Sequence, residues 1–274
     1  MANIDESTVR DFGREWQSFN QTTLPSEELE TRFWQYFGLF PFQELSQGEG
    51  FDLGCGSGRW SALVAPRVGK LHCVDPAGDA LNVARRALKD HPNVDFHEAD
   101  AHNIPLPDES QDFGYSLGVL HHIPDPEAAM AKCVQKLKPG APFLVYLYYN
   151  FENRPGWFKA AWKASDIARQ ALSRAPFGLK KLVTSGIAAT VYYPLARAAL
   201  LLERAGKNVN SIPLSPYREW SFYSMRTDAL DRFGTRLEHR FSRADIRAMM
   251  ERCGLSNIQF SDEVPYWVAI GRKS

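Results

Sequence analysis

The residues of this chain with the clearest chemical potential are three glycines and two carboxylates placed around two short apolar runs. Gly54, Gly56 and Gly58 alternate in one turn that follows Asp52, and a second apolar run ends at Asp75. Glycine permits a positive φ and lets a ligand approach where a Cβ would collide. A carboxylate that ends the next strand is placed to accept both hydroxyls of a ribose. The pattern therefore predicts a site for a nucleoside cofactor.

The spacing of the glycines bears on which cofactor this is. The dinucleotide fingerprint is G-x-G-x-x-G, whereas this chain has G-x-G-x-G with an acid ahead of it. The carboxylate of Asp52 would repel a pyrophosphate but would suit a cofactor that carries an ammonium group. A glycine turn alone is weakly specific, because many such turns only close a strand–helix loop, so an NAD enzyme stays open as an alternative.

The elements that must position these residues follow in a regular order. A helix-compatible segment spans 59–65, and a second helix over 127–137 stops at the breaker cluster Lys138-Pro139-Gly140. Strand-like runs occupy 71–75, 94–101 and 142–149, and the segment 112–126 is predicted to be a strand that runs into a loop. A helix over 242–253, with a serine N-cap and a glycine stop, precedes two closing strands at 257–261 and 266–271.

This succession of motifs resembles the class I S-adenosylmethionine (SAM) methyltransferases of the type 11-like group, closely over residues 48–149. The resemblance implies SAM as cofactor and S-adenosylhomocysteine as product. It implies that Asp75 binds the ribose and that Asp100 lies near the adenine amino group. It places the segment L-H-H-I-P-D-P beside the methionine and the substrate. The cofactor-binding residues it implies are Asp52, Gly54, Gly56, Gly58, Asp75, Pro76, Asp100, Ala101, Leu117, His122 and Trp16.

The fold that this resemblance implies is α/β, a doubly wound, mostly parallel seven-stranded sheet with the last strand antiparallel and a largely helical insertion after the fifth strand. At 274 residues the chain exceeds the usual size of one domain, which agrees with an insertion. Four parts are predicted. An N-terminal helical cap spans residues 1–47, and the SAM-binding core spans 48–150. The helical substrate lid spans 151–241, and the C-terminal helix and strand pair that complete the core span 242–274. The cap is predicted to hold two short helices, over 9–19 and 31–38.

The predicted insertion differs in charge from the rest of the chain. It carries 15 Lys and Arg against 7 Asp and Glu, a balance of +8, within a chain of formal net charge zero. Helices are predicted over 157–173, 179–190 and 194–204, followed by an irregular aromatic stretch over 213–228. Arginine binds carboxylate or phosphate bidentately, so this stretch suits an anionic or planar substrate. The candidate substrate-binding residues are Tyr217, Arg218, Tyr223 and Arg226; the alternative is that they pack within the insertion.

Catalysis by such an enzyme requires alignment of the acceptor with the methyl group and exclusion of water. A general base is needed only if the acceptor must lose a proton, and histidine suits that task. His121 is the candidate base; the alternative is a packing or hydrogen-bonding role, which is common for one of this histidine pair in similar sequences. Tyr148 is the second catalytic candidate, and it should share a face of its strand with Tyr146.

Composition sets further limits. Cys55, Cys73, Cys133 and Cys253 show no C-x-x-C spacing, so we expect neither a metal site nor disulfides. The polar N-terminus lacks a signal-peptide core, which favours a cytoplasmic location. The apolar stretch 182–202 is interrupted by polar residues, so we expect a helix pair broken near Pro194 and no transmembrane segment. Oligomeric state is not predicted.

The favoured function is methyl transfer to a small-molecule acceptor, anionic or aromatic, bound under the helical lid. An RNA methyltransferase that grips phosphates with the basic insertion is an alternative, disfavoured because the insertion is as apolar as it is basic. Another Rossmann-like nucleotide binder, such as an NAD enzyme, is the third alternative. The acceptor atom and the identity of the acceptor are not predicted.

Overall fold

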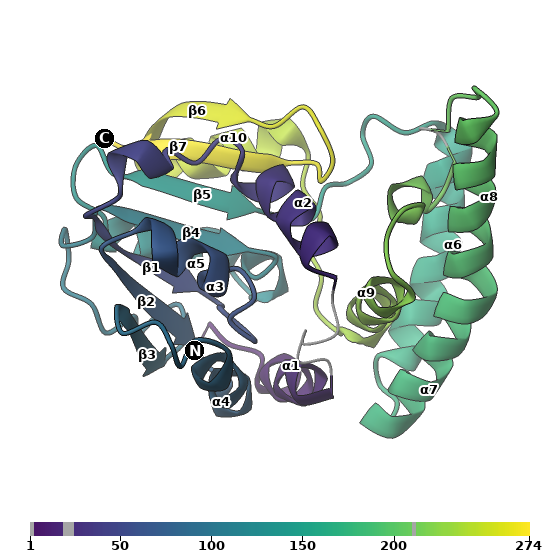
Figure 1. Ribbon diagram of the computed structural model, residues 1–274, viewed down its shortest axis with the longest axis horizontal. Helices are drawn as coiled ribbons and strands as arrows, with labels where there is room; N and C mark the ends of the chain where they lie inside the picture. Colours follow the sequence, from purple (N-terminus) through teal and green to yellow (C-terminus); the bar gives the residue numbers. More distant parts are fainter. Residues whose placement is uncertain (1–2, 19–24, 210–211) are drawn as a thin grey trace. The chain divides into compact units, whose positions relative to one another are not determined.

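The computed structural model describes residues 3–18, 25–209 and 212–274. Its central element is a seven-stranded sheet of order β3-β2-β1-β4-β5-β7-β6, in which β7 runs antiparallel to both of its neighbours and the other pairs are parallel (Figure 1). The strands are β1 (Glu49–Leu53), β2 (Lys70–Asp75), β3 (Val94–Glu98), β4 (Phe113–Leu117), β5 (Pro142–Tyr146), β6 (Leu255–Phe260) and β7 (Val268–Lys273). This confirms the predicted doubly wound sheet with its antiparallel last strand.

Helices cover both faces of this sheet. Strands β1, β4 and β5 are buried almost throughout, as expected when helices lie on both sides of a parallel sheet. One core joins Phe51, Val74 and Phe143 to apolar residues of α5 (Pro126–Lys136) and α10 (Arg243–Arg252). On the other face, the Tyr115 ring packs against Phe37 of α2 (Ser26–Phe37), with ring centroids 5.2 Å apart. The sheet is thus the middle layer of three.

Local sequence signals fix where these helices begin. The Asp125 carboxylate accepts from the Ala128 backbone N–H at 3.0 Å, and a proline occupies the first turn of α5. At α10, Ser242 and Asp245 form the reciprocal capping box that the sequence predicts. The remaining helices of this part are α1 (Glu6–Ser18), α3 (Ser61–Val64) and α4 (Gly78–Ala87). Helices α1 and α2 confirm the two predicted N-terminal helices, although Phe19, the predicted end of the first, lies outside the described residues.

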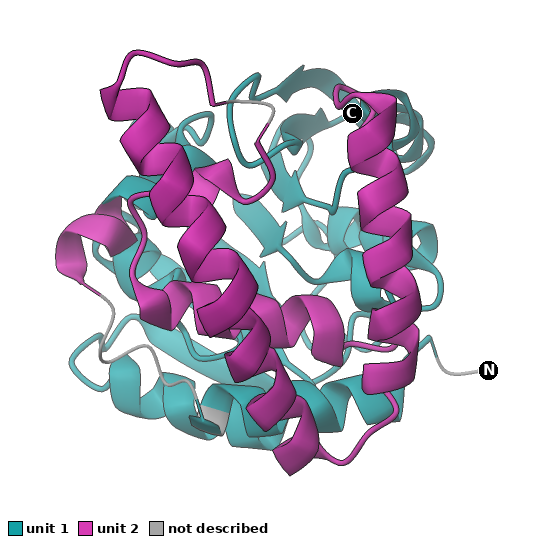
Figure 2. Cartoon of the chain, turned by 90° about the vertical axis from the view of Figure 1, so that its right-hand side faces the viewer, with its two compact units in different colours: residues 1–21, 31–150, 237–274 teal, residues 22–30, 151–236 magenta. Residues whose placement is uncertain are grey.

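The chain divides into two compact units, coloured separately in Figure 2. Unit 1 contains residues 1–21, 31–150 and 237–274, and it holds the whole sheet. Unit 2 contains residues 22–30 and 151–236, so the boundary falls once inside α2. The helices of unit 2 after β5 are α6 (Gly156–Leu172), α7 (Phe177–Ile187), α8 (Tyr193–Arg204) and α9 (Phe222–Gly234).

Two predictions within unit 2 are wrong. The stretch expected to break near Pro194 is one continuous helical run, because a π-helical segment over Ala188–Tyr192 joins α7 to α8 and changes the backbone hydrogen-bond pattern directly before the proline. The aromatic stretch expected to be irregular over 213–228 is helical from Phe222 onward, where α9 begins; before that residue it holds only a 3-10 turn over Ser215–Tyr217. Ser221 caps that helix by accepting from the Ser224 N–H at 3.3 Å.

The helical run Phe177–Arg204 is also the one stretch of the described residues that is long and apolar enough to cross a membrane. Its most apolar window has a mean hydropathy of 1.2, and 22% of that window is buried. Leu182 and Leu201 are among its exposed side chains. By length and composition alone this run could cross a membrane, and the expected absence of a transmembrane segment stays a prediction.

Candidate active site

The glycine turn and the acid at the end of β2 are joined by a hydrogen bond. The Gly56 N–H donates to Asp75 Oδ2 at 2.9 Å, and the Gly54 N–H donates to the Val74 carbonyl at 2.7 Å. Gly56 has φ +54°, and a Cβ there would lie 2.9 Å from Trp16 Nε1. A side chain at this position would therefore meet both a strained backbone and the indole of α1.

Asp75 is held in a fixed orientation and keeps acceptor capacity. Its second oxygen, Oδ1, accepts from the Ala77 N–H at 2.8 Å, so each carboxylate oxygen holds one backbone donor. Because each oxygen has two lone pairs, both can accept a further hydrogen bond from a ligand hydroxyl. Burial raises the pKa of Asp75 to about 6, against the lowering effect of the two N–H donors.

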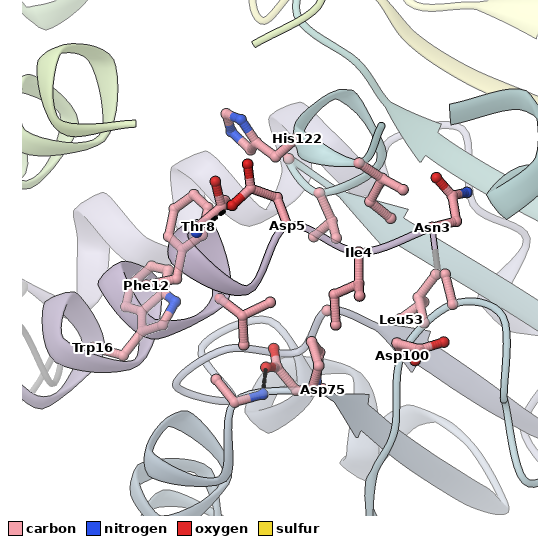
Figure 3. Close-up of a pocket in the computed structure, with 18 of the residues that line it drawn as sticks. Asn3, Ile4, Asp5, Thr8, Phe12, Trp16, Leu53, Asp75, Asp100 and His122 are labelled. Carbon is pink, nitrogen blue, oxygen red and sulfur yellow. Dashed lines mark hydrogen bonds between the residues drawn. The ribbon is translucent and has the colours of Figure 1, made fainter. Parts of the chain in front are cut away.

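A pocket opens beside these groups, and it is lined from several elements of unit 1. Figure 3 shows Asp75 and Asp100 on one side of it, His122 on another, and Phe12 and Trp16 on the wall formed by α1. Eight of the eleven predicted cofactor residues line it: Trp16, Gly54, Asp75, Pro76, Asp100, Ala101, Leu117 and His122. The pocket thus brings together residues that are more than 100 positions apart in the sequence.

The wall formed by the N-terminal segment is fixed at its start by polar contacts. Asn3 and Asp125 pair reciprocally, with the Asn3 amide donating to the Asp125 carbonyl at 2.8 Å and accepting from its N–H at 2.7 Å. Asp5 Oδ1 accepts from the N–H groups of Ser7 and Thr8 and so caps α1. Among the described residues, the buried Thr8 hydroxyl has no hydrogen-bond partner. A polar ligand in this pocket would satisfy it.

The two ends of the pocket differ in chemistry. Asp100 Oδ1 accepts from the backbone N–H groups of His102 and Asn103 at 2.7 and 3.1 Å, which folds the loop after β3 into a tight turn. At the other end, His122 Nδ1 donates to the Leu237 carbonyl at 2.7 Å, leaving Nε2 as the acceptor of the neutral ring. The His122 ring also lies 5.2 Å from that of Phe12.

His121 and Tyr148, the predicted catalytic pair, are in contact. Their rings stack with centroids 3.8 Å apart and an interplanar angle of 27°. His121 is fully buried, and its ring nitrogens have no hydrogen-bond partner within the described part of the chain. Burial lowers the pKa of His121 well below its usual range, so the ring is neutral at pH 7. Neither residue lines the pocket, and their catalytic roles stay predictions.

Three predicted cofactor residues do not line the pocket. The buried Asp52 carboxylate accepts from the Ser61 hydroxyl at 2.6 Å, and burial raises its pKa to about 7. A Cβ on Gly58 would lie 2.9 and 3.1 Å from side-chain atoms of Leu88 and Ala84, so packing against the end of α4 accounts for this glycine. Gly56 contributes its N–H to Asp75 rather than a lining surface. Contact of these three residues with a cofactor stays a prediction.

The predicted substrate residues have partners within unit 2. The Arg218 guanidinium donates to Glu203 at 2.6 Å, and the Tyr217 ring lies 5.4 Å from that of Tyr192. Arg226 Nε donates to the Ser185 hydroxyl at 3.4 Å. Substrate contact by these residues and by Tyr223 stays a prediction.

Most residues of the N-terminal wall were not predicted from the sequence. The additional lining residues of this wall are Asn3, Ile4, Asp5, Thr8, Val9 and Phe12. Positions 5, 8, 9, 12 and 16 follow the spacing of one helix face, which is the signal that could have indicated them. That spacing shows a shared face but not what the face covers.

The fold and this pocket together define a class. A parallel sheet with a glycine turn after β1, an acid at the end of β2 and a pocket at the carboxyl ends of the strands is a Rossmann-like binder of a nucleoside cofactor. The Asp75 carboxylate can accept hydrogen bonds from such a cofactor. The Thr8 hydroxyl, which has no partner among the described residues, can also bind one of its polar groups.

Comparison with known proteins narrows this class. The family model described as "Methyltransferase domain" matches residues 51–145. A protein of Hahella chejuensis named ubiquinone biosynthesis O-methyltransferase is 30% identical over 190 residues, which are 66% of this chain and 76% of that protein. The chain therefore belongs to the class I SAM-dependent methyltransferases, and SAM is its cofactor. This assignment replaces the NAD alternative.

Other similarities are more limited in extent. A ubiquinone biosynthesis O-methyltransferase of Hydrogenovibrio crunogenus is 28% identical over 50% of this chain, and the chain spans 55% of its length. A 37.1 kDa protein of a Streptomyces fradiae transposon is 35% identical, but only 27% of its length is spanned. A SAM-dependent methyltransferase structure from Thermotoga maritima has a TM-score of 0.53 at 15% identity, covering 97% of this chain and all of the other, which shows the shared fold.

Proposed function

We propose that this enzyme transfers the methyl group of SAM to a small-molecule acceptor that is anionic or aromatic and is bound by the helical insertion. The names of the Hahella and Hydrogenovibrio relatives support a small-molecule acceptor. The basic and aromatic composition of the insertion supports the charge and shape of the acceptor. We infer a cytoplasmic location from the sequence alone.

The main support for this proposal is the position of the two connections that join the insertion to unit 1. The chain leaves unit 1 after Asn150, whose N–H donates to the Phe241 carbonyl at 2.9 Å. It returns at Leu237, whose carbonyl accepts from the His122 ring, and the His239 N–H donates to the His121 carbonyl at 2.9 Å. Both connections therefore begin beside the histidine end of the cofactor pocket. An insertion attached there can supply the acceptor-binding surface of the family's transfer reaction.

The residues of unit 1 suggest a division of roles. When bound, SAM supplies a methyl carbon made electrophilic by the adjacent sulfonium. Asp75 would orient the ribose, and Trp16 and Phe12 would exclude water from the pocket. His121 stays the candidate base only for an acceptor that must be deprotonated. Its lowered pKa keeps the ring neutral but also makes it a weaker base.

A screen for product tests this proposal. Purified protein is incubated with SAM and sets of phenols, aromatic carboxylates, phosphorylated metabolites and amines, and S-adenosylhomocysteine release is measured. We expect turnover with one chemical class, and a strongly reduced rate at limiting SAM in Asp75→Ala. If only structured RNA is methylated, with salt-dependent binding, the RNA alternative is correct and the small-molecule proposal is wrong.

A further inference from the structure

A second group of chemically active side chains lies in unit 1, on strands β2 and β3. His72 pairs in register with Asp95, and Val74 pairs with His97. Because alternate residues of a strand share a face, His72, Asp95 and His97 lie on one face of the sheet. None of the three lines the cofactor pocket. The function proposed above therefore leaves this group unexplained.

The polar atoms of the three side chains converge. His72 Nδ1 lies 2.9 Å from His97 Nε2 and 3.9 Å from Asp95 Oδ2, and one ligand atom from each residue falls within 4.8 Å of the others. The His72 ring is buried, whereas the Asp95 side chain is 51% exposed. The group is thus anchored on one side and open to solvent on the other.

A fourth side chain orients the buried histidine. His72 Nε2 lies 2.7 Å from Glu49 Oε1, so the ring donates its Nε2–H to this carboxylate. Nδ1 then carries the lone pair, and it faces His97 and Asp95. A carboxylate behind a histidine is the usual second partner of a metal-binding imidazole, because it fixes the tautomer and raises the basicity of the ligating nitrogen.

We propose that His72 Nδ1, His97 Nε2 and an Asp95 carboxylate oxygen bind a divalent transition-metal ion, with Zn²⁺ the best match. Two imidazoles and a carboxylate are ligands that Zn²⁺ accepts, with water completing the tetrahedron. In the metal-free protein the His97 Nε2–H donates to His72 Nδ1. On binding, His97 moves its single proton to Nδ1 through solvent, and both facing nitrogens then present lone pairs to the ion.

The rearrangement that this requires is small. Ligands about 2.0–2.1 Å from a tetrahedral ion are separated by roughly 3.3 Å, so the two histidine nitrogens must part by about 0.4 Å. Asp95 Oδ2 must approach His72 Nδ1 by about 0.6 Å, which its exposed side chain permits. Lys70, whose ammonium lies 3.0 Å from Asp95 Oδ2, competes with the metal for this carboxylate.

Zn²⁺ titration tests the proposal. Competition with a chromophoric chelator at pH 7.5 should give one Zn²⁺ per chain with micromolar or tighter affinity, and a rise in melting temperature. His97→Ala and Asp95→Asn, both at incompletely buried positions, should weaken binding by more than about 100-fold, a larger loss than removal of a second-sphere partner. Exposed His102→Ala is the matched control and should bind as the wild type does.

Two further variants separate a metal site from a hydrogen-bond network that only ties β2 to β3. Glu49→Gln should weaken Zn²⁺ binding by about 10- to 100-fold. Lys70→Gln should strengthen it, because a competing cation is removed, although it also removes an ion pair. If folded wild-type protein binds no Zn²⁺ at micromolar concentration, or if His97→Ala and Asp95→Asn bind it as wild type does, the proposal is wrong. Binding of S-adenosylhomocysteine reports on the other pocket and should be unchanged in all of these variants.

Discussion

The Gly56 N–H donates to Asp75 Oδ2 across 2.9 Å, so a hydrogen bond links the turn after β1 to the acid that ends β2. This contact explains why the two motifs occur together. The Gly56 N–H orients the Asp75 carboxylate, and the same hydrogen bond fixes the backbone of the glycine turn. The remaining lone pairs of Asp75 then face the pocket as a prepared acceptor pair.

Removal of the Asp75 carboxylate should weaken cofactor binding. Asp75→Ala loses charge-assisted hydrogen bonds worth about 1.5–3 kcal/mol, or about 10- to 150-fold in the dissociation constant of S-adenosylhomocysteine. Isothermal titration calorimetry measures this directly. Asp108→Ala, which removes an exposed ion pair with Lys136, is the control and should bind normally. An unchanged affinity in Asp75→Ala would mean that this residue is not the ribose ligand.

Cofactor affinity should also depend on pH. The pKa of Asp75 is raised to about 6, and only its ionised form can accept from a ribose hydroxyl on both oxygens. As the pH falls from 7.5 through 6 to 5, protonation should weaken S-adenosylhomocysteine binding progressively. In Asp75→Asn the affinity should be lower at pH 7.5 and nearly flat over this range. An equally steep profile in the variant would assign the titration to another group.

The glycine turn should tolerate no side chain at Gly56. Gly56→Ala places an L-residue at φ +54° and a Cβ 2.9 Å from the Trp16 indole. The strain alone costs about 1–2 kcal/mol, and the contact adds to it. Gly118→Ala is the matched control, because φ is +79° and nothing lies within 4 Å of the added Cβ. Urea denaturation should show a larger loss for Gly56→Ala than for Gly118→Ala; equal losses would contradict the close approach of the Trp16 indole to this turn.

Asp52 should make stability fall as the pH rises. Its pKa in the folded protein is about 7 against 3.8 ordinarily, so the folded state binds the proton more tightly than the unfolded state. The free energy of unfolding should therefore decrease between about pH 4 and 7 and level off above 7. Asp52→Asn removes this part of the dependence, and Asp75 contributes a similar part that remains. We expect the variant to be more stable than wild type at pH 8, by on the order of 1 kcal/mol. At pH 5 this gain should be smaller. If the gain is the same at both pH values, the pKa of Asp52 is not raised.

The insertion should act on the acceptor and not on the cofactor. With an anionic acceptor in hand, Arg218→Ala and Arg226→Ala should raise KM for it while leaving the affinity for S-adenosylhomocysteine unchanged. Glu203→Gln removes the Arg218 partner without removing the guanidinium, and it controls for loss of packing. If KM is unchanged in both arginine variants, these side chains have only the structural contacts seen within unit 2.

The sheet and the motif residues were predictable because each depends on local sequence. The glycine turn, the acid that ends β2 and the capping box at Ser242 follow from residues only a few positions apart. The wall formed by α1 was not predictable in the same way. Asn3 pairs with Asp125 across 122 positions, and no local pattern indicates such a partner.

Two structural errors have physical causes as well. Pro194 was expected to break a helix, but the π-helical segment directly before it changes the backbone hydrogen-bond pattern where the proline lacks an N–H, and the run continues. The aromatic residues around Phe222 obscured a helix whose start is set by Ser221. The group of His72, Asp95 and His97 was missed because His72 lies on a different strand from the other two and meets them only through strand pairing.

Calorimetric titration of the wild-type protein with S-adenosylhomocysteine and, separately, with NAD tests directly whether the pocket binds SAM. We expect one site per chain with micromolar affinity for S-adenosylhomocysteine, weakened in Asp75→Ala, and no measurable binding of NAD. Micromolar binding of NAD with no binding of SAM or S-adenosylhomocysteine would contradict it.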